Sequence, residues 1–114
     1  MIDWSRVEEL RREIGETGFA EVVSLFWEEV ESILCRLSVD SATQLESDLH
    51  FLKGSVWNLG FRDFGALCQH GEKKAAQGRA AEVDLALVAG QYYAAKAAFL
   101  GGLSAASLPE PRIA

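Results

Sequence analysis

The chain of 114 residues has almost no proline, because its two prolines, Pro109 and Pro111, both lie near the C-terminus. Proline interrupts helices more strongly than any other residue, so long helices are permitted over all the preceding sequence. Residues that favour strands are also few, since Val, Ile and Thr together number 14 against 30 for Leu and Ala. This composition favours an all-α fold over a sheet.

Basic residues are scarce, and long apolar runs are lacking. Eleven basic and seventeen acidic side chains give a net charge of -6, which repels both nucleic acids and anionic membrane surfaces. The sequence contains no apolar stretch long enough to span a membrane and no N-terminal segment typical of a secretion signal. We therefore expect a cytoplasmic protein that binds neither nucleic acid nor membrane.

Cysteine is limited to Cys35 and Cys68. Two cysteines are too few for a disulfide scaffold, and we expect both to be buried thiols. The two histidines, His50 and His70, do not combine with them at the spacing of a known zinc site. No Glu-x-x-His pair, the motif of carboxylate-bridged metal bundles, is present. We therefore expect no metal site.

The apolar periodicity predicts five helices, over residues 4–14, 17–37, 41–59, 63–77 and 81–103. Ser5 with Glu8, and Ser41 with Gln44, have the spacing of N-terminal capping boxes. The simplest packing is an antiparallel up-and-down four-helix bundle, with the additional short N-terminal helix across one end. We assign residues 1–104 to this domain and residues 105–114, which include both prolines, to a flexible C-terminal tail.

Packing does not explain His50. On a helical wheel it lies about 140° from the centre of the apolar stripe of its helix, so its side chain should face solvent. Lys53 and Gly54, three and four residues later, share that face. Glycine inside a helix costs about 1 kcal/mol relative to alanine, so we expect Gly54 to provide space. A nucleophilic imidazole, a flexible ammonium and open space together suit the transfer of a phosphoryl group.

A motif around His50 resembles the histidine-containing phosphotransfer domain of multistep two-component phosphorelays. Its residues are His50-Phe51-Leu52-Lys53-Gly54-Ser55, then Leu59-Gly60, Leu67-Cys68 and Glu72. The resemblance implies that His50 is the phosphoacceptor, that Lys53 contacts the phosphoryl group, and that Gly54 leaves room for this group and for the partner.

Two positions depart from the family's usual residues, namely Phe61 and Gly71. Gly71 falls on the apolar stripe of its helix, so either that helix approaches a neighbour closely or its middle is weakened. The second histidine, His70, has Lys74 where the first site has glycine, and we expect it at the surface or boundary of the bundle.

The sequence contains no phosphate-binding loop and no kinase signature. We therefore expect a phosphoryl carrier without a bound cofactor or kinase activity of its own. The resemblance implies response-regulator receiver domains and a sensor (hybrid) histidine kinase as partners, with Mg²⁺ held by the receiver domain. We expect the carrier to be a monomer.

The partner surface should surround His50. Exposed aromatic side chains are typical of binding hot spots, and the candidate residues are Trp57, Phe51, Trp27 and Ser55. An alternative function is a helical-bundle adaptor or inhibitor that binds a kinase or receiver domain without being phosphorylated. That alternative predicts that His50→Ala leaves signalling intact.

Overall fold

The computed structural model describes residues 2–107, and the regular secondary structure in this range is helical. Its elements are α1 (Trp4–Arg36), α2 (Ala42–Asn58), α3 (Arg62–Ala76), the short 3-10 helix η1 (Ala80–Glu82) and α4 (Leu85–Ser107). Within these residues, pairing of the β type is limited to an isolated bridge between Ile2 and Phe61. The all-α prediction is therefore confirmed for the described part of the chain.

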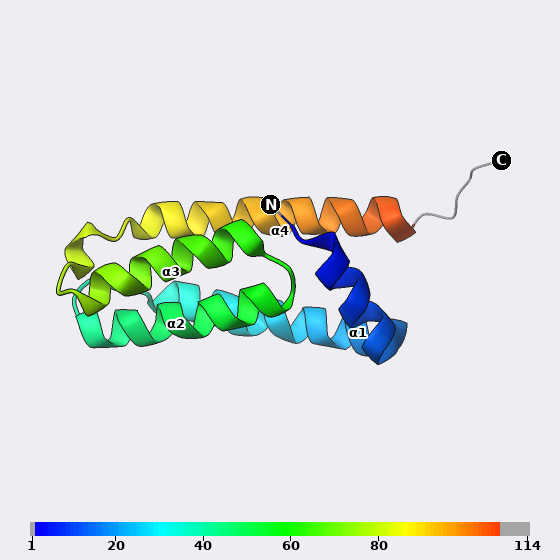
Figure 1. Cartoon of the computed structure of the whole chain (residues 1–114), viewed down its shortest axis with the longest axis horizontal. Coiled ribbons are helices and arrows are strands. Elements are labelled where there is room, and N and C mark those ends of the chain that lie inside the picture. The colour runs from blue at the N-terminus through cyan, green and yellow to red at the C-terminus, as the bar shows by residue number, and fades with distance from the viewer. Residues whose placement is uncertain (1, 108–114) are drawn as a thin grey trace.

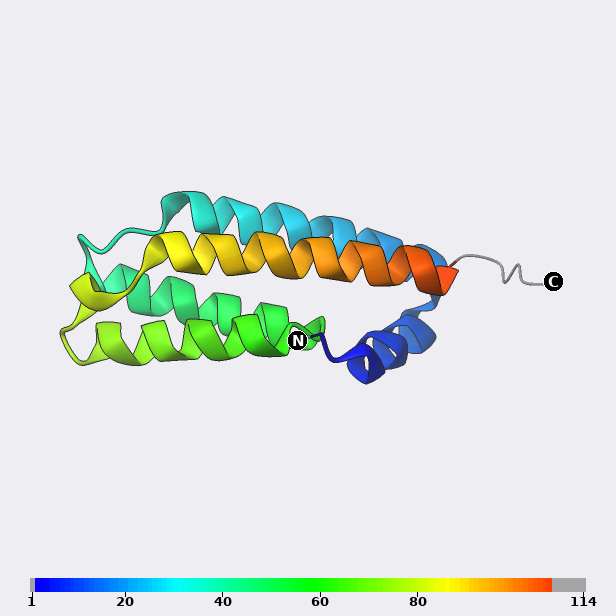
Figure 2. The ribbon, with the colours of Figure 1, turned by 90° about the horizontal axis from the view of Figure 1, so that it is seen from above.

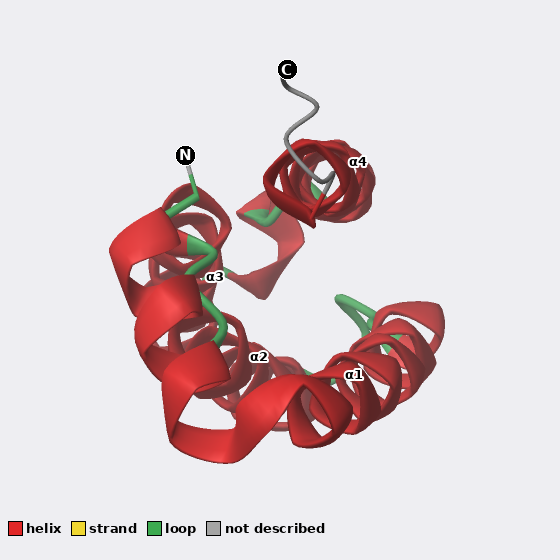
Figure 3. Ribbon diagram, turned by 90° about the vertical axis from the view of Figure 1, so that its right-hand side faces the viewer, coloured by secondary structure: helices red, strands yellow, loops and turns green. Residues whose placement is uncertain are grey.

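The four α-helices run along one long axis, and each runs back beside the one before it (Figures 1 and 2). Seen along this axis, α2 lies between α1 and α3, and α4 faces them from the other side (Figure 3). In the region that the structure describes, no helix combines the length and the apolar character needed to cross a membrane. The arrangement gives α2, which carries His50, one neighbour on each side.

α1 contains a kink at Gly15, whose backbone angles of φ 79° and ψ 168° are not helical. A positive φ is accessible to glycine at low cost, so the chain bends here. The segment before Gly15 lies at an angle to the rest of α1, near one end of the molecule (Figure 1). Gly15 lies at the boundary that the sequence predicted between helices over residues 4–14 and 17–37, and the structure joins these two helical segments across the kink as α1.

The N-cap of α1 is Asp3, and the prediction of a capping box at Ser5 was wrong. The Asp3 carboxylate accepts a hydrogen bond of 3.2 Å from the backbone N–H of Arg6. The backbone N–H of Asp3 donates to the carbonyl oxygen of Gly60 at 2.7 Å, which holds the start of the chain against the α2–α3 turn. The predicted cap of α2 is confirmed, because Ser41 accepts from the N–H of Gln44.

The predicted apolar stripe of α2 is confirmed. All five of its members are at most 2% exposed, namely Leu45, Leu49, Leu52, Val56 and Leu59. Cys68 is buried as predicted, but Cys35 is exposed, so that prediction was wrong. Cys35 follows Ile33 by two residues, which places it about 200° away from this buried side chain around α1.

α4 begins at Leu85 and not near residue 81, because the chain first forms η1. The Asp84 carboxylate then accepts a hydrogen bond of 3.0 Å from the N–H of Leu87, as N-cap residues do. α4 continues to Ser107, so residues 105–107 of the predicted tail are helical. The rest of that predicted tail, residues 108–114, lies outside the described residues.

Candidate functional site

Gly71 lets α3 approach α2 beside His50. A Cβ atom added to Gly71 would lie 2.9 Å from Cδ1 of Leu49, closer than packed carbon atoms approach. Leu49 directly precedes His50, and Gly71 directly precedes Glu72. The contact therefore brings His50 and Glu72 to the same level of the two helices. The sequence left open whether Gly71 allows close approach of a neighbouring helix or weakens the middle of its own helix. The structure shows the close approach.

Glu72 forms a bridge between His50 and Lys53. Its Oε2 lies 2.7 Å from Nδ1 of His50, and its Oε1 lies 2.9 Å from Nζ of Lys53. The side chain of His50 is 67% exposed, whereas those of Lys53 and Glu72 are each 18% exposed. The sequence suggested a flexible ammonium that is free in solvent. In the structure, the ion pair with Glu72 instead holds the ammonium of Lys53 in place.

The pKa of Glu72 is lowered from its ordinary value. Burial acts to raise this pKa, but hydrogen bonds and charge interactions with Lys53 and His50 together outweigh it. Glu72 is therefore ionised at neutral pH, and an ionised carboxylate only accepts hydrogen bonds. Nδ1 of His50 must then carry the hydrogen of this contact. In the neutral imidazole the free lone pair is on Nε2, which is the nucleophilic atom.

Gly54 leaves open space one helical turn after His50. A Cβ atom at this position would meet no heavy atom within 4 Å, and the residue is exposed. Packing within the described chain therefore gives no reason for glycine here. The space lies on the solvent side of α2, where an approaching molecule would contact His50.

Trp57 follows Lys53 by one helical turn on α2, and its ring lies over α3. Trp57 is 40% exposed, and Nζ of Lys53 lies 6.0 Å from the centroid of its ring. Its Nε1 donates a hydrogen bond of 3.2 Å to the carbonyl oxygen of Arg62. A Cβ atom at Gly65 would collide with the indole ring. Gly65 therefore positions Trp57, a role that the analysis of the sequence missed.

The other predicted partner residues are placed differently from one another. Phe51 is 46% exposed and lines a groove shared with α1, and Ser55 is half-buried. Trp27 is half-buried and packs against rings of α4 and the α2–α3 turn, such as Tyr92 and Phe61. Trp27 thus faces the interior between α1 and α4, and the structure does not bring it together with His50.

His70 and Cys68 take no part in the His50–Glu72–Lys53 cluster. His70 is exposed, as expected. Cys68 is buried, and burial with the nearby charge of Glu72 raises the pKa of its thiol to about 12, which makes it an inert side chain. Among residues 2–107, no group of three or more His, Cys, Asp or Glu side chains is placed to hold a metal ion.

The role of Glu72 in holding His50 was also missed from the sequence. Its presence in the family motif was the available signal, but spacing alone does not place a residue of α3 against one of α2. The contact depends on the register of the two helices, which Gly71 and Leu49 determine.

Comparison with known families places this geometry in context. A family model described as the Hpt domain matches residues 21–99, which is more than half of the chain and includes the whole cluster around His50. Searches of curated proteins and of solved structures gave no match. The chain therefore belongs to the Hpt family, the histidine-containing phosphotransfer domains that act in phosphorelays.

Proposed function

We propose that Nε2 of His50 accepts a phosphoryl group from the aspartyl phosphate of one receiver domain and passes it to another. One observation carries this proposal: Glu72 holds Nδ1 of His50 at 2.7 Å while the imidazole remains 67% exposed. The nucleophilic nitrogen is thus defined and open to a partner. Gly54, one turn away, leaves space on the same side.

In the transfer step, the lone pair of Nε2 attacks the phosphorus atom in line with the leaving carboxylate. The N–P bond forms as the bond between phosphorus and the aspartyl oxygen breaks, and the aspartate leaves as a carboxylate. The hydrogen on Nδ1 stays in its contact with Glu72, so no proton has to leave. The negative charge of Glu72 stabilises the positive charge that develops on the ring.

In this proposal the ammonium of Lys53 neutralises the phosphoryl oxygens. Its ammonium shares Glu72 with His50, so a small rotation of a flexible side chain transfers it from the carboxylate to the phosphoryl group. The Mg²⁺ of the reaction belongs to the receiver domain and not to this chain. Electrostatic stabilisation of the transferred group is therefore divided between the two proteins.

The partners we propose are receiver domains of response regulators and of a hybrid sensor kinase. With no nucleotide-binding motif in its sequence, this chain would receive its phosphate from a protein and not from ATP. The direction of transfer would follow the relative phosphoryl potentials of the partners. The cytoplasmic location and the monomeric state remain predictions from the sequence.

The direct test is phosphorylation by a charged receiver domain. Receiver domains loaded with acetyl phosphate and Mg²⁺ are incubated with the wild-type protein, His50→Ala and His70→Ala. We expect acid-labile, base-stable phosphate on the wild type and on His70→Ala, and none on His50→Ala. If the folded wild type gains no phosphate from any member of a broad receiver panel, the carrier function is wrong and the adaptor alternative is favoured.

A further inference from the structure

The outer face of α4 carries no charge. Lys96 is the single charged residue of Leu85–Ser107, and its ammonium is paired with the Glu31 carboxylate on the inner side, between α1 and α4. On the outer side, Leu87, Tyr93 and Leu100 are each about half exposed. A surface helix usually carries charged residues opposite its core. The outer face of α4 is thus an apolar surface on a protein with a net charge of -6.

Two glycines on this face have no role in the packing of the described chain. A Cβ atom added to Gly90 or Gly101 would meet nothing beyond its own helix backbone within 4 Å, whereas one added to Gly102 would collide with the ring of Trp4. Glycine weakens a helix interior relative to alanine. Packing against Trp4 explains Gly102, but nothing in the described chain explains Gly90 or Gly101. Their missing side chains allow another helix to approach α4 closely.

The spacing of the small residues on this face is symmetric. Four of them lie within about 60° of one another around α4, at steps of four, three and four residues: Gly90, Ala94, Ala97 and Gly101. These steps are the same when read from either end of the helix. A two-fold contact between identical chains needs such a pattern, because the same surface must complement itself. In two antiparallel copies, Gly90 would lie opposite Gly101.

We propose that two copies of this chain pair through the outer faces of their α4 helices in antiparallel orientation. The small residues let the backbones approach, and Tyr93 of each copy packs against Leu100 of the other. Because α4 has 23 residues, the contact is about 34 Å long and buries on the order of 1,000 Å² over both copies, near the lower limit for a specific interface. We therefore expect a weak dimer with a Kd of roughly 100 μM. The monomer predicted from the sequence is then the form that predominates in dilute solution.

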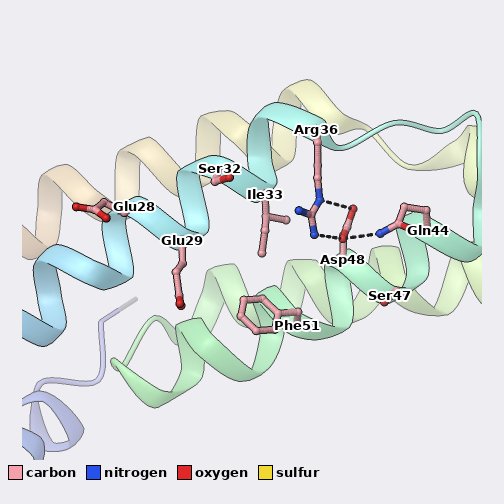
Figure 4. Close-up of a pocket in the computed structure, with 9 residues that line it drawn as sticks. All are labelled: Glu28, Glu29, Ser32, Ile33, Arg36, Gln44, Ser47, Asp48 and Phe51. Carbon is pink, nitrogen blue, oxygen red and sulfur yellow. Dashed lines mark hydrogen bonds and ion pairs between the residues drawn. The ribbon is translucent and has the colours of Figure 1, made fainter.

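Charge favours a second copy at this face over one at the groove between α1 and α2. Glu28 and Glu29 are exposed beside that groove (Figure 4). The guanidinium of Arg36 is already paired with the buried Asp48. Two copies joined there would place carboxylates opposite each other, and like charges oppose association. α4 brings no charged side chain to the proposed contact, and it offers no charge to a basic or acidic partner.

The proposed contact lies away from His50. Seen along the long axis, α4 faces α2 from the other side of the bundle (Figure 3). A dimer formed through α4 would therefore leave both His50 side chains open to receiver domains. Substitutions on the outer face of α4 should separate the two copies without changing the rate of transfer by each copy.

The test is sedimentation equilibrium of the full chain from about 10 μM to about 1 mM. The wild type is compared with Tyr93→Glu, with Leu100→Lys and with an equal mixture of these two variants. Leu25→Glu and Leu25→Lys are the matched controls, because Leu25 is an exposed leucine of α1, outside the proposed contact. Circular dichroism checks that each variant keeps its helices.

We expect the average mass of the wild type to rise from one chain toward two as its concentration increases. Tyr93→Glu and Leu100→Lys should each raise Kd at least about tenfold, because each removes an apolar contact and brings an unpaired charge to the contact. Their mixture should associate more tightly than either variant alone, since antiparallel pairing brings the two opposite charges together. Both Leu25 variants should associate as the wild type does.

Three results would overturn the proposal. A wild type that stays a single chain up to about 1 mM would leave this face to a different protein. A dimer that Tyr93→Glu and Leu100→Lys do not weaken, or that the Leu25 variants weaken equally, would place the contact elsewhere. Loss of association in both variants without recovery in their mixture would contradict antiparallel pairing. None of these measurements uses phosphate transfer, so they fail or succeed independently of the proposed function.

Discussion

Two carboxylates in this bundle bridge a lysine and a ring side chain, yet their surroundings differ. Glu72 joins Lys53 to His50 on the outer side of α2 and α3. Glu31 joins Lys96, at 2.5 Å, to the hydroxyl of Tyr92, at 2.8 Å, between α1 and α4. The pKa of each carboxylate is lowered, so both are ionised at neutral pH.

The Glu31 cluster is closed to solvent on the side of its ring. Tyr92 is 0% exposed, and burial raises the pKa of its hydroxyl. Nζ of Lys96 also lies 4.8 Å above the ring of Trp27. In the Glu72 cluster, by contrast, the ring belongs to an exposed histidine with a free nitrogen. Both clusters link two helices, but the open one also leaves a ring nitrogen available for chemistry.

The largest effect on phosphate transfer should come from filling the open space at Gly54 beside His50. Gly54→Leu should reduce phosphate transfer at least about a hundredfold, because displacement of reacting groups by about 1 Å has effects of this size. The substitution should preserve or increase helicity, since leucine favours helices by close to 1 kcal/mol over glycine. Transfer is measured with charged receiver domains, and helicity by circular dichroism.

Gly90→Leu is the matched control for this variant. Gly90 is an exposed glycine inside α4, and a Cβ atom there would also meet nothing within 4 Å. It should gain the same helix propensity and transfer phosphate normally. Normal transfer by Gly54→Leu would show that the space beside His50 is not needed.

An intermediate effect should follow from removing each carboxylate in turn. Glu72→Ala should slow transfer about tenfold to a hundredfold, the rate equivalent of one charged hydrogen bond of about 1.5 to 3 kcal/mol. Glu72→Gln should recover part of this loss, because an amide oxygen still accepts from Nδ1. Single-turnover transfer rates provide the measurement.

Glu31→Ala is the counterpart in the closed cluster. It should leave the rate of transfer unchanged but lower the free energy of unfolding by about 1 to 3 kcal/mol, because the hydroxyl of Tyr92 loses its partner. Equal transfer rates for Glu72→Ala and the wild type would remove the distinction between the two clusters.

The smallest effect concerns the stability of the closed cluster in acid. The hydrogen bond from Lys96 is the main cause of the lowered pKa of Glu31, opposed by burial and assisted by Tyr92. A lowered pKa means that the charged contact stabilises the fold above the ordinary value near 4.5, and that this stability is lost as pH falls through the lower folded value.

Glu31→Gln keeps the size and hydrogen-bonding oxygen of this side chain but does not titrate. The wild type should therefore be the more stable protein at pH 7, and the two free energies of unfolding should converge as the solution is acidified. Chemical denaturation across this pH range measures both. A constant difference down to strongly acidic pH would show that the charge of Glu31 contributes nothing.

Periodicity was sufficient to predict most of each helix and the outward direction of His50, but not the start and end of α4. The five buried members of the α2 stripe lie at steps of three and four, so their positions around the helix also determine which residues face away. The open space at Gly54 followed from the same wheel together with the cost of glycine in a helix. These properties are local, and local sequence determines them.

The contacts between helices could not be predicted in this way. The bridge made by Glu72 needs the register of α3 on α2, which depends on the fit of Gly71 against Leu49. The inward orientation of Trp27 depends on the position of α4, so it too requires the packed bundle and not one helix alone. The exposure of Cys35, by contrast, follows from its place around α1, about 200° from the buried Ile33, and the helical wheel alone could have predicted it.

The account is tested most directly by identifying the nitrogen that carries phosphate. The protein is labelled with ¹⁵N at histidine, phosphorylated by a charged receiver domain and examined by NMR, which distinguishes the two ring nitrogens. We predict phosphate on Nε2 of His50, with the hydrogen retained on Nδ1 beside Glu72. Phosphate on Nδ1 of His50, or on another residue, would contradict the account.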